Sequence, residues 1–188
     1  MLTMIDNIIG VPVMSLQTGT RLAHTSDVIV DPRQLTIAAL YVDGPLVSTR
    51  PSVVYPSDIR EISDIGFIVD SDSKLMPLDG LVRLQEIIDF GFVLKGARVV
   101  DEDGKKHGKV SNYAIDPESF TIQQLYTSES LLRSFANAGR IIHRSQIVAI
   151  HENVVVIKST VTKVSADTSL ASSPSFVNPF RHAEQPEG

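Results

Sequence analysis

Asp31-Pro32-Arg33-Gln34-Leu35-Thr36-Ile37 recurs 85 residues later as Asp116-Pro117-Glu118-Ser119-Phe120-Thr121-Ile122, and this repetition decides the fold of the chain. At the same offset, Leu40-Tyr41 matches Leu125-Tyr126. Further along the offset becomes 88, where Ser57, Ile59 and Ile62 match Ser145, Ile147 and Ile150. A repeated unit explains both offsets if its second copy has three additional residues between its central strands and its closing segment.

Each copy reads as a series of short apolar stretches separated by residues that favour turns. The β-branched residues of these stretches favour strands, and the Asp-Gly pair at 103–104 is typical of a hairpin turn. Five or six short strands within about 65 residues are typical of a small barrel or sandwich. We therefore predict a mainly β protein made of two tandem small β-barrels. Its core should include six strand residues, some of which should face outward because side chains alternate between faces: Ile29, Ile37, Leu40, Ile115, Ile122 and Leu125.

The domain boundaries follow from the repeat. We assign residues 1–70 to the first barrel, 71–92 to a linker, 93–163 to the second barrel and 164–188 to a tail. The spacing of apolar residues in Pro77–Asp89 predicts a short linking helix, capped by Asp79 and stopped by Gly91. Ser128–Ala138 is a second predicted helix, inside the second barrel. The tail is predicted to be disordered, because ordering it would cost more entropy than burying Phe176 and Phe180 returns.

Composition excludes several classes of function. The chain has 188 residues, of which 43% are hydrophobic and 21% charged, and it contains no cysteine. Disulfides, thiolate nucleophiles and Cys-ligated zinc are therefore ruled out. The net charge of −5 comes from −6 in residues 1–93 and +1 in residues 94–188, a balance that argues against direct nucleic-acid binding. Neither a signal peptide nor a membrane-spanning run is seen, so we expect a soluble, cytoplasmic protein.

No motif for catalysis or for a cofactor is present. The five histidines show no metal-ligand spacing and are interpreted as surface residues: His24, His107, His143, His151 and His182. Asp101-Glu102-Asp103-Gly104 resembles the start of a calcium loop, but position twelve would be Asn112, so a charged hairpin turn is favoured. The basic run Lys105–Lys109 is interpreted as a solvated turn. We expect no enzyme activity, no cofactor and no metal.

The second copy resembles the PRC-barrel family. The resemblance lies in Lys95-Gly96-Ala97-Arg98-Val99-Val100-Asp101, in Gly104, in Gly108-Lys109-Val110 and Ile115-Asp116, and in the closing segment His143–Ile150. In the first copy, Ile9-Gly10-Val11-Pro12-Val13 matches the start of the pattern. The family includes the H subunit of photosynthetic reaction centres, a ribosome maturation factor that binds a small-subunit ribosomal protein, and archaeal division proteins. The resemblance covers residues 8–70 and 93–158, and it implies an interaction module without a reaction of its own.

Three functions are therefore considered. The leading hypothesis is a non-enzymatic adaptor whose barrels bind another protein, of unknown identity. The alternatives are a ribosome-assembly factor that binds a ribosomal protein, and a small-ligand binding protein that uses the cleft between the barrels. The candidate partner site lies on and just after the second predicted helix. Leu131, Leu132 and Phe135 either plug the open end of their own barrel or form an exposed apolar patch, with Arg133 and Arg140 as its polar rim.

Overall fold

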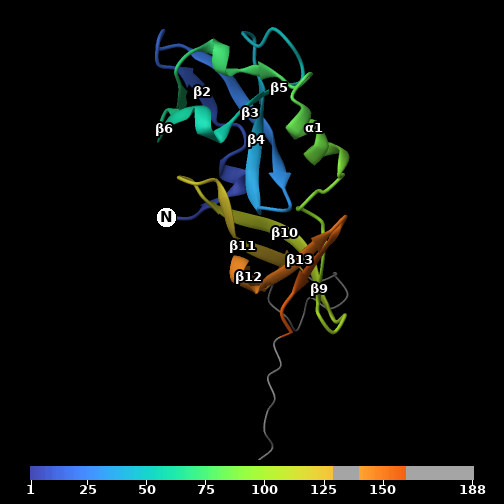
Figure 1. The fold of residues 1–188 in the computed structure, drawn as a ribbon. Coiled ribbons are helices and arrows are strands. Elements are labelled where there is room, and N and C mark those ends of the chain that lie inside the picture. Colours follow the sequence, from blue (N-terminus) through green and yellow to red (C-terminus); the bar gives the residue numbers. More distant parts are fainter. Residues whose placement is uncertain (129–139, 160–188) are drawn as a thin grey trace, which may run out of the picture.

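A computed structural model describes residues 1–128 and 140–159, and over these residues the protein is mainly β (Figure 1). The strands of the first repeat and its flanks are β1 (Thr3–Met4), β2 (Pro12–Ser15), β3 (Arg21–Asp31), β4 (Thr36–Asp43), β5 (Ser52–Val54), β6 (Ile59–Ser63), β7 (Gly66–Val69) and β8 (Met76–Pro77). Those of the second repeat are β9 (Arg98–Asp101), β10 (Lys106–Asp116), β11 (Thr121–Ser128), β12 (Ile141–His143), β13 (Ile147–His151) and β14 (Val154–Ile157). The helical elements described are α1 (Val82–Asp89) and the 3₁₀ turns η1 (Ile5–Asn7), η2 (Pro56–Asp58), η3 (Asp72–Lys74) and η5 (Arg144–Gln146).

The two repeats use the same strand pairing. In the first, β2 pairs antiparallel with β3 and parallel with β7, and in the second β9 pairs in the same way with β10 and β14. Val30 lies opposite Ile37 as Ile115 lies opposite Ile122, which confirms the offset of 85. Leu40 lies opposite Val54 as Leu125 lies opposite Ile142, which confirms the offset of 88. The three additional residues therefore lie in the connection between β11 and β12.

The strands join into one open path rather than two separate sheets. The order is β13-β14-β9-β10-β11-β4-β3-β2-β7-β6, so β13 and β6 form its two ends within the described residues. The mainly β composition is confirmed, whereas the expected pair of closed barrels is not. In Figure 1 the blue-to-green strands of the first repeat lie above the yellow-to-orange strands of the second, and the two groups meet where β4 approaches β11.

The meeting point is formed by the two Asp-Pro turns of the repeated stretch. In each turn the aspartate accepts a hydrogen bond from the backbone N–H two residues on, 2.9 Å for Asp31 and 3.2 Å for Asp116. Each turn then enters its strand through a residue in the left-handed region, Leu35 with φ 52° and Phe120 with φ 53°. These residues accept reciprocal bonds: Ile37 N–H donates to the Phe120 carbonyl at 2.9 Å, and Ile122 N–H to the Leu35 carbonyl at 2.8 Å. The contact has the reciprocal form of a two-fold interface, within one chain.

The buried core extends across both repeats. One cluster of buried apolar side chains contains residues from each repeat, and the rings of Phe67 and Phe120 meet inside it with centroids 6.2 Å apart. All six predicted core residues are buried, so the expectation that some face outward is wrong. For Ile29 the reason is α1, because Leu84 of this helix covers the opposite face of β3 and buries Ile29 in a second cluster. The other five lie in the first cluster, because register shifts in β4 and β11 bring residues three positions apart to the same side.

The linking helix exists but begins later than predicted. Met76–Pro77 pairs with β5 instead of starting the helix, and Gly80 turns the chain with φ 83°. The residue before the first turn is Leu81, so Asp79 is not the cap. The stop at Gly91 is confirmed, with φ 69° and its N–H bonded to the Ile88 carbonyl. Across residues 1–128 and 140–159, none of the helices has the length and apolar character needed to cross a bilayer.

Candidate functional site

Most of the predicted partner site lies outside the described residues. This holds for Leu131, Leu132, Arg133 and Phe135, and the predicted tail from 164 onward lies outside them as well. Arg140 is described and exposed, and its backbone holds the end of β11: Thr127 N–H donates to the Arg140 carbonyl at 2.9 Å, and Arg140 N–H donates to Thr127 Oγ1 at 3.2 Å. The patch with Arg140 at its rim stays a prediction.

The Asp101–Lys105 turn is built around a buried histidine. His107 Nε2 lies 2.9 Å from Asp101 Oδ2, and the two side chains are 4% and 8% exposed. The other Asp101 oxygen accepts hydrogen bonds from the backbone N–H groups of Lys105 and Asp103. The hydrogen bond from His107 holds the pKa of Asp101 below its ordinary value. The hairpin-turn interpretation of this segment is confirmed, but the expectation that His107 lies on the surface is wrong, because the aspartate gives its ring a buried partner.

The described histidines and acids do not gather elsewhere. Within residues 1–128 and 140–159, no three His, Asp or Glu side chains converge as metal ligands would. His24, His143 and His151 are exposed, as predicted. Among the described residues, the candidate site therefore consists of surface side chains rather than a cluster of titratable groups.

Arg144 connects the start of β13 to the first repeat. Its guanidinium donates to the carbonyl oxygens of Gln34 and Leu35 at 2.6 and 2.9 Å, and to that of Ile122 at 3.3 Å. The first two acceptors belong to the turn of the first repeat and the third to β11 of the second. Because β13 begins three residues after Arg144, these bonds fix the position of β13 relative to the turn of the other repeat.

A surface hollow lies between β13 and that turn. Its volume is about 280 Å³, and it is lined by the Ile147–Ile150 part of β13, by Pro32, Arg33 and Leu35 of the turn, and by Phe90. Phe90 follows the last residue of α1 and is 41% exposed, and Val148 is 49% exposed. Arg33 is the only charged residue of this lining. Seven of its eight lining residues are thus apolar, and the eighth is a cation.

Two neighbouring hollows share the ring of Phe90. One, of about 110 Å³, lies toward α1 and adds Arg83 and Glu86 to the lining. The other, of about 380 Å³, lies toward the β13–β14 hairpin and adds Arg98 and His151. Phe90 is therefore the centre of a continuous surface at the junction of the two repeats.

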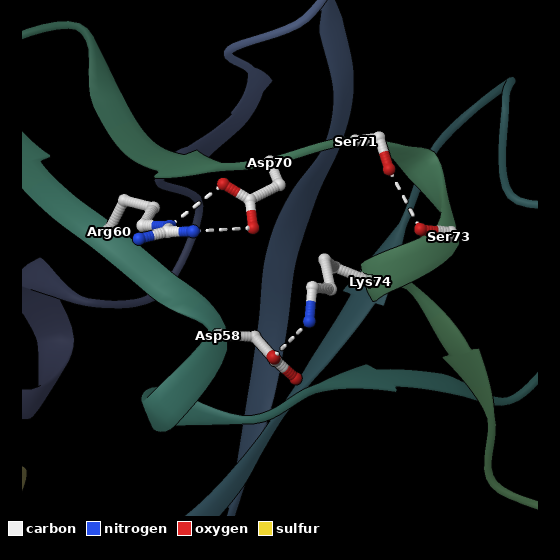
Figure 2. A network of polar contacts seen from close by, with 6 residues as sticks. All are labelled: Asp58, Arg60, Asp70, Ser71, Ser73 and Lys74. Carbon is white, nitrogen blue, oxygen red and sulfur yellow. Dashed lines mark hydrogen bonds and ion pairs between the residues drawn. The ribbon is translucent and has the colours of Figure 1, made fainter.

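The strand of the first repeat that corresponds to β13 is β6, and charged residues on and around it form ion pairs (Figure 2). Arg60 of β6 donates to both oxygens of Asp70, at 2.8 and 3.1 Å, and Lys74 pairs with Asp58 at 2.7 Å. Beside them, the Ser71 and Ser73 hydroxyls lie 2.7 Å apart. At the offset of 88, Arg60 and Glu61 correspond to Val148 and Ala149. The same strand of the same unit is therefore charged in the first repeat and apolar in the second.

The sequence prediction did not include this surface, although one signal for it is present in the repeat. The substitution of charged by apolar residues between β6 and β13 can be read from the repeat itself, once the offset of 88 is known. The proximity of Phe90 and Arg33 to β13 could not be read, because it depends on how the two repeats meet.

Comparison with known proteins adds no assignment. A scan against protein-family models finds no match for this chain. A search of curated proteins finds no match either.

Proposed function

We propose that this protein is a non-enzymatic, cytoplasmic adaptor that binds another protein, built from two PRC-barrel-like repeats at 1–70 and 93–163. The observation that supports it best is the apolar surface around Phe90 and Val148. Phe90 and Val148 line the same hollow and are 41% and 49% exposed, and aromatic side chains are enriched where proteins bind one another. The resemblance of the repeat to a family of interaction modules points the same way.

Quantitative affinity purification with the full chain tests this proposal. The expected result is a small set of proteins retained in near-stoichiometric amounts, before and after nuclease treatment. Retention of no protein, or retention that requires nucleic acid, would refute the adaptor function. Co-sedimentation with small ribosomal subunits separates the ribosome-assembly alternative from the leading one.

A doubly substituted variant tests the segment 128–138. In Leu132→Ser with Phe135→Ser, a docking patch would be lost while the melting temperature stays near that of the wild type. If the segment instead plugs the second repeat, the free energy of unfolding of the variant should fall by about 2–5 kcal/mol per buried residue. A folded variant with undiminished partner capture would dispose of this segment as the partner site.

The hollow at the junction favours one further candidate, a small-ligand binding protein. Concave, mainly apolar hollows with few polar groups are typical of ligand sites. A ligand present at about 100 times its dissociation constant would raise the free energy of unfolding by about 2.7 kcal/mol, which a thermal-shift screen detects. Absence of any stabilising compound, together with protein partners in the purification, would favour the adaptor.

A further inference from the structure

The strand β13 ends the sheet path, and no other described strand pairs with its outer edge. Within residues 1–128 and 140–159 its backbone ladder is formed with β14 alone. Backbone groups along a strand point alternately to either side, so part of the N–H and C=O groups of β13 point away from β14. Such an edge is a template for another extended chain.

Proteins commonly protect an edge of this kind with charged side chains. The first repeat does so on β6, where Arg60 is held by Asp70 and Glu61 is exposed. The second repeat carries Val148 and Ala149 at the same positions, and Val148 is 49% exposed. The charged side chains on the edge strand of the first repeat are thus replaced by apolar ones on the described edge strand of the second.

The surface beside this edge specifies the chemistry of an occupant. The hollow next to β13 offers Leu35 and Phe90 as apolar contacts and Arg33 as its only charge. Arg33 is exposed and forms no ion pair with any described residue. Glu86 and the buried Asp31 line the hollow on the α1 side, together with Arg83, and neither acid lines the one beside β13. A segment that carries an apolar side chain and a carboxylate is therefore complementary to this surface.

We propose that β13 binds an extended peptide segment of a partner protein by strand addition, with an apolar side chain over Phe90 and an acidic side chain on Arg33. This inference rests on the proposed function and names its partner class. Main-chain hydrogen bonds supply affinity in this mode, and pockets for alternate side chains supply specificity. Arg144 fixes the position of the β13 edge relative to the hollow, because its guanidinium donates to carbonyl oxygens of the turn that carries Arg33.

The test is selection from a random peptide library on the immobilised full chain, followed by anisotropy measurements with labelled synthetic peptides. Enriched peptides should alternate apolar residues with other residues and carry Asp or Glu. Val148→Arg, which copies the charge of β6, should weaken binding by at least about tenfold. Arg33→Glu should weaken binding by a similar factor, and a peptide with Lys in place of its acid should restore it.

Ile62→Arg is the matched control, because Ile62 is an exposed apolar residue on β6, 44% exposed, and its substitution should leave peptide binding unchanged. Melting temperatures check that each variant is folded. Peptides without alternation, an empty selection, or equal binding to folded Val148→Arg would overturn the inference. Analytical ultracentrifugation provides a further check. If the wild type is a dimer and Val148→Arg is a monomer, a second copy of the chain occupies the edge, and the inference is overturned. If the wild type and Val148→Arg retain the same cellular proteins in affinity purification, the adaptor function is supported and β13 is excluded as its binding site.

Discussion

The Phe120 side chain is expected to couple the folding of the two repeats. Its ring is 4% exposed and meets Phe67 of the first repeat inside the shared core. Replacing a buried Phe with Ala costs about 3–5 kcal/mol, of which the aromatic contact accounts for about 0.5–1.5 kcal/mol. Because natural domains are stable by only about 5–15 kcal/mol, Phe120→Ala should remove a large part of the free energy of unfolding.

Urea unfolding followed by methyl NMR measures this effect in both repeats at once. The isoleucine methyl signals of Ile37 and Ile122 report on the first and second repeat, and both residues are buried in the shared cluster. Both signals should lose their folded intensity at the same urea concentration, in the wild type and in Phe120→Ala. Leu16→Ala is the control, because Leu16 is 65% exposed and substitutions at exposed positions usually change stability by about 0.5 kcal/mol or less. A loss below about 1 kcal/mol in Phe120→Ala, or an unchanged midpoint for Ile37, would refute the coupling.

Three further results are expected. Arg144→Met should lower the free energy of unfolding by about 1.5–3 kcal/mol, because a charged donor to backbone carbonyls of both repeats is lost, whereas Arg140→Met should have little effect in the same denaturation assay. Asp101 has a lowered pKa in the folded state, so its contribution is present above the ordinary carboxyl pKa and is lost as pH falls through the lowered value. The melting temperature of Asp101→Asn should therefore lie below that of the wild type at pH 7 and approach it in acid, and a constant difference would contradict the role of the His107 hydrogen bond. Removing residues 166–188 should leave the melting temperature nearly unchanged, and a drop of several degrees in calorimetry would show that this segment docks.

The repeat made most of the strand pairing predictable. Because Asp31-Pro32 matches Asp116-Pro117, the strands predicted for one repeat could be carried over to the other. The change of offset from 85 to 88 located the three additional residues between β11 and β12. Side-chain alternation alone failed for Ile29, since only the placement of α1 shows that both faces of β3 are covered.

The contact between the repeats was beyond prediction from local patterns. Leu35 and Phe120 have positive φ without being glycines, so no residue preference marks them. The burial of His107 likewise depends on Asp101 lying across the turn from it. The hollow at Phe90 combines residues more than 50 positions apart, which periodicity within one strand or helix cannot bring together.

The reciprocal pairing of the Asp-Pro turns has a consequence for how this surface could arise. In an assembly of two identical chains, every substitution would appear on both sides, and an unprotected edge would be present twice. Covalent linkage removes that constraint, because one position can change while its equivalent does not. The chain can thus keep the reciprocal contact at its centre while its two outer strands differ, with charged residues on β6 and apolar ones on β13.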